Sequence, residues 1–270
     1  MSLIGTALAS LLVTNLVAQS VEKRLQVSEP GVGLSRFVSY ASKATRGEFQ
    51  ANAAFWAKDV DWSCASPWNS DRGRLKAGTL VSRRHVVFAR HFPIAEGSRI
   101  LFVGKDGAVC PCRIVKTKAI EGSDIMVGAL DYEVTPNIRP AKILPGDHEK
   151  YIGDGVGLPL VAFTQNERAS VTEVAQIYTN KVKCVRCRPP TDPLRTRFFE
   201  KIVLGDSGNP VFMLVGDEPV LLFCLSGGGA GSGAALHRFR SEVQATMDEL
   251  CPGYRLEEFD FSQVAGGDER

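Results

Sequence analysis

Short apolar runs, separated by glycine, proline and asparagine residues, recur along most of the chain. Those of strand-like length lie at residues 78–88, 100–103, 125–130, 158–163, 171–178, 211–215 and 220–225. Many short strands with turn residues between them are typical of a β-sandwich or a β-barrel. The pattern therefore predicts an all-β core.

Residues 236–250 follow a different period. Phe239, Val243, Met247 and Leu250 recur there at helical spacing. This spacing predicts a C-terminal helix that turns these four side chains toward the core.

The length and composition suit a folded, turn-rich protein. A chain of 270 residues has room for one large domain or two small ones and can bury a substantial core. Residues 136–157 are rich in proline, glycine and charge, and we interpret them as a linker between two halves. No internal repeat or low-complexity tract interrupts this organisation.

The charge balance argues against one class of partner. Lysine and arginine number 32 against 30 acidic residues, which gives a formal net charge of +2. Domains that bind nucleic acid usually carry a clear basic excess. We therefore expect no nucleic-acid partner, and we interpret the basic residues within 181–188 as a solvated loop.

The N-terminal segment is apolar and small, with no charge before Glu22. Residues 3–18 are too short and too often interrupted by polar side chains for stable membrane insertion. We predict a signal peptide in residues 1–20, cut after Ala18 or Ser20, and hence a secreted or periplasmic protein. Because a positive n-region is missing, an N-terminal helix of the mature protein is the alternative.

Seven cysteines fit either redox compartment poorly, because an odd number leaves at least one free thiol in an exported protein. Two closely spaced pairs, Cys110 with Cys112 and Cys184 with Cys187, have some resemblance to zinc ligands. We expect them in different halves of the protein, so we predict no metal site and favour disulfides of the second pair or reduced thiols. Cys224 lies in an apolar run, which is typical of a packed core thiol.

The six residues 205–210 read Gly-Asp-Ser-Gly-Asn-Pro. A serine flanked in this way can stand on a tight turn that exposes its hydroxyl and directs the backbone N–H groups of Gly205 and Ser207 to one point. A nucleophile and a cradle for an oxyanion are the two parts that acyl transfer needs. Glycine and serine also populate ordinary turns, so the motif needs upstream partners.

Two upstream residues have the chemistry that an activated serine requires. His91 ends an apolar run and can take the proton of the hydroxyl, and Asp124 opens another apolar run and can orient the imidazole. The chain order is His, Asp, Ser. This order differs from that of α/β-hydrolases and of subtilisins, and Asn209 stands where the α/β-hydrolase turn needs glycine.

Four blocks of the sequence resemble the chymotrypsin/trypsin-like serine peptidase family. Residues 78–91 are similar to its G-T-L-I-S-x-x-x-V-L-T-A-A-H segment, residues 123–130 to D-I-A-L-L-x-L, and residues 205–210 to G-D-S-G-G-P. Residues 221–228 more weakly resemble the strand that ends in V-S-W-G. The resemblance extends over roughly residues 45–250.

The resemblance implies two six-stranded antiparallel β-barrels followed by a C-terminal helix. Residues 45–140 would form the first barrel with His91 and Asp124, and residues 141–255 the second barrel and the helix, with Ser207. An N-terminal extension at 21–44 and a tail at 256–270 would flank them. The active-site cleft would then lie between the barrels.

The expected activity is that of a serine endopeptidase acting on a protein or peptide substrate without a cofactor. Ser207 would be the nucleophile, and the N–H groups of Gly205 and Ser207 would form the oxyanion hole. The resemblance places Ser226, Gly227 and Gly228 alongside the bound peptide. It also places Lys201 at the base of the primary pocket, where it would favour acidic or polar side chains. The alternative is a rearranged loop in which Lys201 points to solvent.

Departures from the family pattern keep alternatives open. Arg90 and Phe92 flank His91 where the family has alanine and cysteine, and no activation-cleavage sequence precedes residue 78. The sequence therefore does not show how Asp206 and the oxyanion turn are held. A catalytically silent fold that binds proteins is the alternative, and a non-proteolytic esterase would use the same triad.

Overall fold

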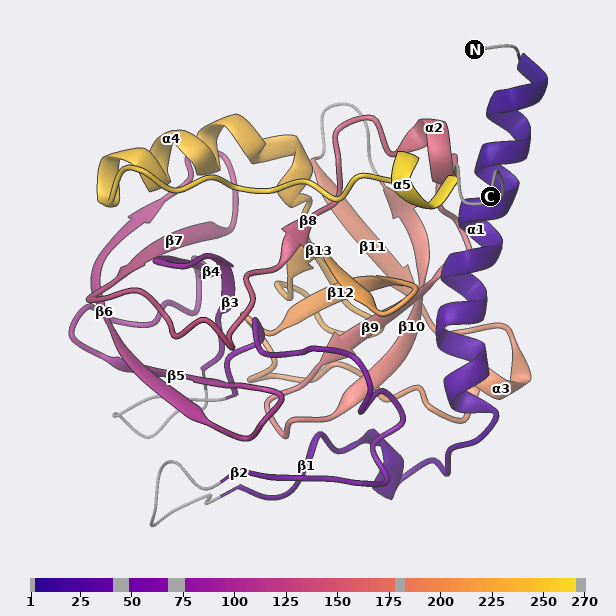
Figure 1. Ribbon diagram of the computed structural model, residues 1–270, viewed down its shortest axis with the longest axis horizontal. Helices are drawn as coiled ribbons and strands as arrows, with labels where there is room; N and C mark the ends of the chain where they lie inside the picture. The colour runs from indigo at the N-terminus through magenta and orange to yellow at the C-terminus, as the bar shows by residue number, and fades with distance from the viewer. Residues whose placement is uncertain (1–2, 41–48, 68–75, 178–182, 266–270) are drawn as a thin grey trace.

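Figure 1 shows the computed structural model, which describes residues 3–40, 49–67, 76–177 and 183–265. The fold is mixed α/β. A five-stranded sheet and a seven-stranded sheet pack against each other, and helices from both ends of the chain cover their outer sides.

The five-stranded sheet is antiparallel and open. Its strands, from one edge to the other, are β3 (Thr79–Ser82), β4 (His85–Ala89), β7 (Ile125–Leu130), β6 (Val109–Ala119) and β5 (Arg99–Val103). The long strand β6 pairs with β5 through its first half and with β7 through its second half, and the register shifts between Ile114 and Lys116. This bend curls the sheet into a half-barrel. We call residues 79–130 the five-stranded half.

The seven-stranded sheet is mixed. Its order is β14 (Ser232–Ala234), β11 (Cys184–Arg188), β10 (Ala169–Ile177), β9 (Pro159–Phe163), β12 (Pro210–Val215), β13 (Glu218–Cys224) and β8 (Lys142–Ile143). Neighbouring strands are antiparallel except β13 and β8, which run parallel. We call residues 142–234 the seven-stranded half.

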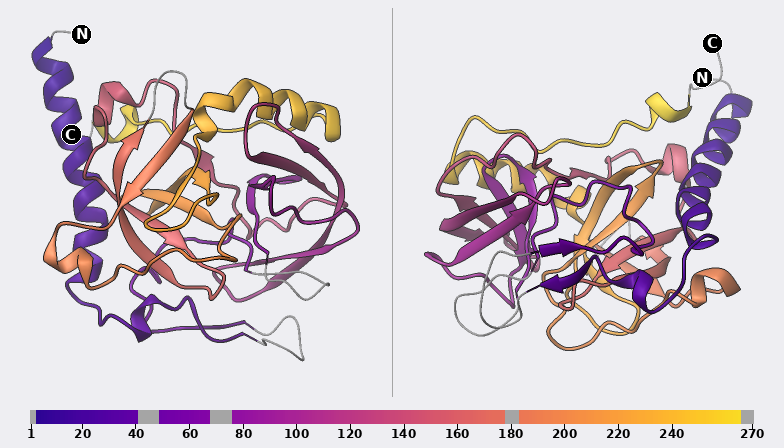
Figure 2. Two further views of the ribbon diagram at one scale, coloured as in Figure 1. Left: turned by 180° about the vertical axis from the view of Figure 1, so that it is seen from behind. Right: turned by 60° about the horizontal axis from the view of Figure 1, so that its bottom comes forward.

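The remaining elements are short apart from two helices. They are α1 (Leu3–Leu25), η1 (Val32–Leu34), the paired strands β1 (Phe37–Tyr40) and β2 (Phe49–Ala51), α2 (Glu149–Ile152), α3 (Pro193–Thr196), η2 (Leu236–Phe239), α4 (Arg240–Leu250) and α5 (Ser262–Ala265). In both views of Figure 2, α1 stands along the outer side of the seven-stranded sheet.

The expectation of an all-β protein with two six-stranded barrels is wrong. The strands form an open five-stranded half-barrel and a seven-stranded mixed sheet, and α1 alone has 23 residues. Apolar runs reveal where strands lie but not which strands pair, because pairing depends on contacts between distant segments. The supposed linker, residues 136–157, also folds into β8 and α2, and Ile143 and Leu144 are fully buried.

Most of the predicted strand segments are present, with one correction. Residues 78–88 form the hairpin of β3 and β4, because Arg83 and Arg84 make a turn where we expected a continuous strand. The predicted C-terminal helix is confirmed as η2 followed by α4. Phe239, Val243 and Met247 are buried, and Leu250 packs partly buried at the edge of the core.

Helix α1 belongs to the hydrophobic core. Val13, Val17, Val21 and Leu25 repeat every four residues, so they lie on one face of the helix and are almost completely buried. The helix runs without a break past Ala18 and Ser20. Export remains a prediction, and a cut at either position would remove Val13 and Val17 from the core.

No helix in the described part of the chain is long and apolar enough to cross a bilayer.

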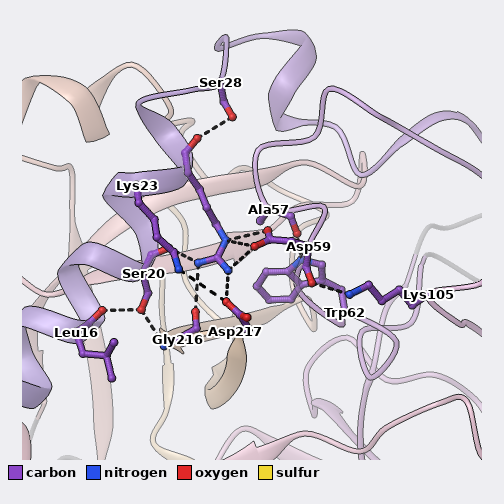
Figure 3. A network of polar contacts seen from close by, with 11 residues as sticks. Leu16, Ser20, Lys23, Ser28, Ala57, Asp59, Trp62, Lys105, Gly216 and Asp217 are labelled. Carbon is purple, nitrogen blue, oxygen red and sulfur yellow. Dashed lines mark hydrogen bonds and ion pairs between the residues drawn. The ribbon is translucent and has the colours of Figure 1, made fainter. Parts of the chain in front are cut away.

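A polar network ties α1 to the segment before β3 and to the seven-stranded half (Figure 3). The buried Arg24 guanidinium donates to both carboxylate oxygens of Asp59, with Nε 2.9 Å from Oδ1, and to Asp217 in the β12–β13 turn. Ser20 Oγ accepts the N–H of Gly216 at 2.8 Å. Burial alone would raise the pKa of the Asp59 carboxyl, but Arg24 outweighs burial and holds that pKa below its ordinary value.

Candidate active site

His91, Asp124 and Ser207 meet where the two halves face each other. His91 Nδ1 lies 2.7 Å from Asp124 Oδ2, and His91 Nε2 lies 2.8 Å from Ser207 Oγ. Both distances are those of good hydrogen bonds. The three side chains therefore form a continuous chain from carboxylate to imidazole to hydroxyl.

The pairing of β4 with β7 sets the distance between His91 and Asp124. Ala89 lies opposite Ile125 at the end of this ladder, and Arg90 N–H continues it to the carbonyl of Asp124 at 3.0 Å. His91 therefore leaves β4 beside the residue that enters β7. A separation of 33 positions in sequence becomes a direct contact.

The Asp124 carboxylate holds His91 through two bonds. Oδ1 accepts the backbone N–H of His91 at 2.9 Å, and Oδ2 contacts Nδ1 of the ring. With Nδ1 donating to the carboxylate, Nε2 carries the free lone pair that faces Ser207. The imidazole is thereby oriented as a base for the hydroxyl.

Ser207 stands on a turn just before β12, and this turn is anchored on both sides. Gly208 N–H donates to the carbonyl of Leu225 at 2.9 Å, and Leu225 N–H donates to the carbonyl of Asn209 at 2.8 Å. At Gly208 the backbone has φ +88°, and a Cβ would lie 3.0 Å from the carbonyl oxygen of Ala77. Glycine is needed here because the turn presses against the five-stranded half.

The predicted oxyanion donors lie on the same turn. Gly205 has φ +103°, a conformation that glycine adopts without strain. Among the described residues, neither the N–H of Gly205 nor that of Ser207 has a hydrogen-bond acceptor. Two unused donors next to the nucleophile match the requirement for stabilising a tetrahedral oxyanion.

A cavity of about 260 Å³ opens beside His91 and Ser207. The predicted substrate residues Ser226, Gly227 and Gly228 line it. The remaining wall is apolar and is formed by Ile202, Val203, Leu204 and Leu225. A pocket with these walls suits an apolar side chain.

Lys201 does not line this cavity, contrary to the sequence-based expectation. Its side chain is exposed at the surface, whereas the next residue, Ile202, is buried and reaches the cavity wall. Ile202 is held there by a two-way backbone bridge with Gly229, at 2.8 and 3.1 Å. Counting back from the nucleophile predicts the loop but misses the residue by one position.

A second, larger cavity of about 610 Å³ lies on the other side of Ser226. Asp124 and Ser226 line it, together with charged residues of both signs that include Glu121, Lys183 and Arg186. Because Ser226 lines both cavities, the two form adjoining parts of one cleft.

The cysteines take no part in the triad. All seven carry free thiols, and among the described residues no three metal-binding side chains are grouped. The predicted core position of Cys224 is confirmed, and its thiol donates to the carbonyl of Val87 across the two sheets at 3.6 Å. Burial raises the pKa of Cys224 to about 12, so this thiol stays protonated and does not compete with Ser207 as a nucleophile.

Two further residues hold the nucleophile turn, and neither of them was assigned a role from the sequence. Gln165 lies in the turn between β9 and β10, and its side chain reaches the carbonyl of Leu204 at 3.0 Å. Asn209 stood out only as a departure from the glycine of the resembling family. Its amide donates to the carbonyl of Asp206 at 3.0 Å.

A comparison with protein-family models and a search of curated proteins both found no match to this chain.

Proposed function

We propose that this chain is a serine endopeptidase. Ser207 Oγ attacks the scissile carbonyl while His91 Nε2 takes its proton. The imidazolium then returns the proton to the leaving amine, and a water molecule repeats the sequence on the acyl-enzyme to release the acid. Asp124 keeps the ring in the correct tautomer and stabilises its charged form.

The observation that carries the proposal is the unbroken hydrogen-bond chain of 2.7 and 2.8 Å through His91. Its members come from three separate loops in two sheets, and a fold without catalysis has no need to align them. The side chain of His91 is 46% exposed, so substrate and water have access to the reacting atoms.

Binding of an extended peptide is supported by unused backbone groups. Among the described residues, the carbonyl of Ser226 and the N–H of Gly228 have no hydrogen-bond partner. Both lie at the cavity next to Ser207. A peptide can pair with them as an added strand while one of its side chains enters the apolar pocket.

The deciding experiment is active-site labelling with a fluorophosphonate. Wild-type protein should be modified at Ser207, and the Ser207→Ala variant should remain unlabelled. Cleavage should then be measured on a peptide library and on simple esters. Labelling with ester but no peptide hydrolysis would point to an esterase, and folded protein without label or turnover would favour a silent binding fold.

The Ser207→Ala variant is the matched control for every assay, because removing one oxygen leaves the surrounding turn unchanged.

A further inference from the structure

Gln165 holds the peptide group between Leu204 and Gly205, whose N–H is the first predicted oxyanion donor. The Nε2–H of Gln165 donates to the carbonyl of Leu204 at 3.0 Å. The amide group lies directly on Gly205, where a Cβ would come within 2.6 Å of Gln165 Oε1. In this conformation the Gln165 amide occupies the space that a side chain at position 205 would need.

Asn209 holds the peptide group between Asp206 and Ser207, whose N–H is the second predicted oxyanion donor. The Nδ2–H of Asn209 donates to the carbonyl of Asp206 at 3.0 Å, and its backbone N–H donates to the same oxygen at 3.2 Å. Asn209 is buried, with 3% of its surface exposed. This side chain is thus committed to one carbonyl oxygen.

Holding these two carbonyls also directs the two N–H groups. In a planar trans peptide the C=O and the N–H point in opposite directions. When Gln165 fixes the carbonyl of Leu204, the N–H of Gly205 turns away from Gln165. In the same way, fixing the carbonyl of Asp206 turns the N–H of Ser207 away from Asn209.

We propose that Gln165 and Asn209 form an amide pair that positions the two oxyanion donors. The inference rests on the proposed function, because an oxyanion forms only if Ser207 attacks a carbonyl. Neither Gln165 nor Asn209 lines the cavity beside Ser207, so both are positioning residues. They act by preventing rotation of the peptides that carry the donors.

The buried carboxylate of Asp206 completes the arrangement from within the chain. Its Oδ1 accepts the backbone N–H of Gln165 at 2.9 Å, and its Oδ2 accepts that of Val203 at 2.8 Å. Each carboxylate oxygen has a donor without any new N-terminus. The oxyanion turn is therefore held without a newly cleaved N-terminus, which explains how Asp206 and this turn are held although no activation-cleavage sequence precedes residue 78.

The test uses Gln165→Met, which keeps the length of a half-buried side chain but removes its donor. Gln176→Ala, on the exposed face of β10, is the matched control for a glutamine lost from the same hairpin. Asn209→Ala is the second variant, with thermal unfolding to check its fold. Turnover of a peptide substrate and affinity for a peptide boronic acid, which mimics the tetrahedral adduct, are measured for each protein.

For Gln165→Met and Asn209→Ala we expect kcat to fall on the order of 10²-fold, the effect of losing one oxyanion donor. The boronic-acid affinity should fall in parallel, while KM stays within about twofold and the pH profile keeps its midpoint. Gln176→Ala should match the wild type. An unchanged kcat and an unchanged boronic-acid affinity in folded Gln165→Met would overturn the proposal.

A crystal structure of Gln165→Met separates this inference from the proposed function, because it needs no activity. The inference expects the Leu204–Gly205 peptide to rotate away from its wild-type orientation. An unrotated peptide in the variant contradicts the inference even if the wild type is active. Wild-type protein that fails to react with a fluorophosphonate contradicts the proposed function instead.

Discussion

In the five-stranded half, His91 and Asp124 stand at the ends of two neighbouring strands, and the β4–β7 ladder sets their separation. In the seven-stranded half, Ser207 lies on a turn outside the ladder. That turn is held by side chains that include Gln165, which is 41 positions from Asp206. Strand register places His91 and Asp124, whereas the Ser207 turn is held by backbone bonds with Leu225 together with the side-chain amides of Gln165 and Asn209.

This difference determines which substitutions should slow the proposed reaction. A ladder of backbone bonds tolerates changes of side chain, because the bonds belong to groups that every residue has. A turn braced by two amides loses its shape when one amide is lost. Outside the triad, the seven-stranded half should therefore be the more sensitive part of the active site.

The largest expected effect tests the five-stranded half. His91→Ala should lower kcat by about 10⁶-fold, and Asp124→Asn by about 10⁴-fold, because the base is indispensable and the carboxylate only orients it. Steady-state kinetics on a peptide substrate measures both losses. Thermal unfolding should show both variants folded, since neither side chain belongs to the core. A nearly active Asp124→Asn would mean that the ladder alone can orient His91.

The next effect concerns helix α1, which Arg24 joins to Asp59 and to the β12–β13 turn. Arg24→Met removes a buried cation that bonds Asp59, Asp217 and the carbonyl of Gly216, and should lower the free energy of unfolding by about 2–4 kcal/mol. Urea unfolding measures this loss. Lys23→Met is the control, because the neighbouring lysine is exposed and reaches Asp217 only at 4.0 Å. Equal losses in the two variants would show that the network contributes little.

A smaller effect sharpens the description of the pocket in the seven-stranded half. Peptides that place a leucine-like side chain in the cavity should be cleaved about 10–200-fold more efficiently than those that place aspartate there. The reason is the apolar wall of Ile202 and Leu225. Profiling kcat/KM over a peptide series measures the ratio. Lys201→Ala should leave this ratio unchanged. A shift toward neutral substrates in that variant would instead show that Lys201 contributes to the pocket.

The smallest effect compares buried histidines in the two parts of the chain. Burial lowers the pKa of His85 to about 4. Burial, together with the neighbouring His148 ring, lowers the pKa of His237 to about 3. Below about pH 6.5 these two histidines bind protons in the unfolded chain but stay neutral in the folded protein. Stability should therefore fall as pH drops from 6.5 toward 4, by about 1–2 kcal/mol per histidine at pH 5.5 to 5.

Urea unfolding at a series of pH values measures this dependence. The variant His237→Phe keeps a ring in the same place but cannot be protonated, so its stability should change less steeply between pH 6.5 and 4. A slope as steep as that of the wild type would show that His237 is not the group responsible.

Much of the site, but less of the fold, was predictable from the sequence. Ser207, His91 and Asp124 were recognisable because a nucleophile, a base and a carboxylate each stood in a distinctive local context. Ile202 was missed by one position, and Gln165 gave no signal at all, since a glutamine in a hairpin turn has no distinguishing pattern. The sequence also predicted the positions of most strands, but not the parallel pairing of β8 with β13.

By itself the sequence determined the local features of this protein. It contains the strand and helix segments, the glycine that the nucleophile turn needs at position 208, and the three residues that can carry acyl transfer. Only the tertiary structure decided the rest: an open half-barrel beside a mixed sheet, α1 in the core, and the side-chain amides of Gln165 and Asn209 on the oxyanion turn. The physical reason is that local patterns report on each residue's own backbone and burial, whereas pairing and bracing depend on segments that meet only when the chain has folded.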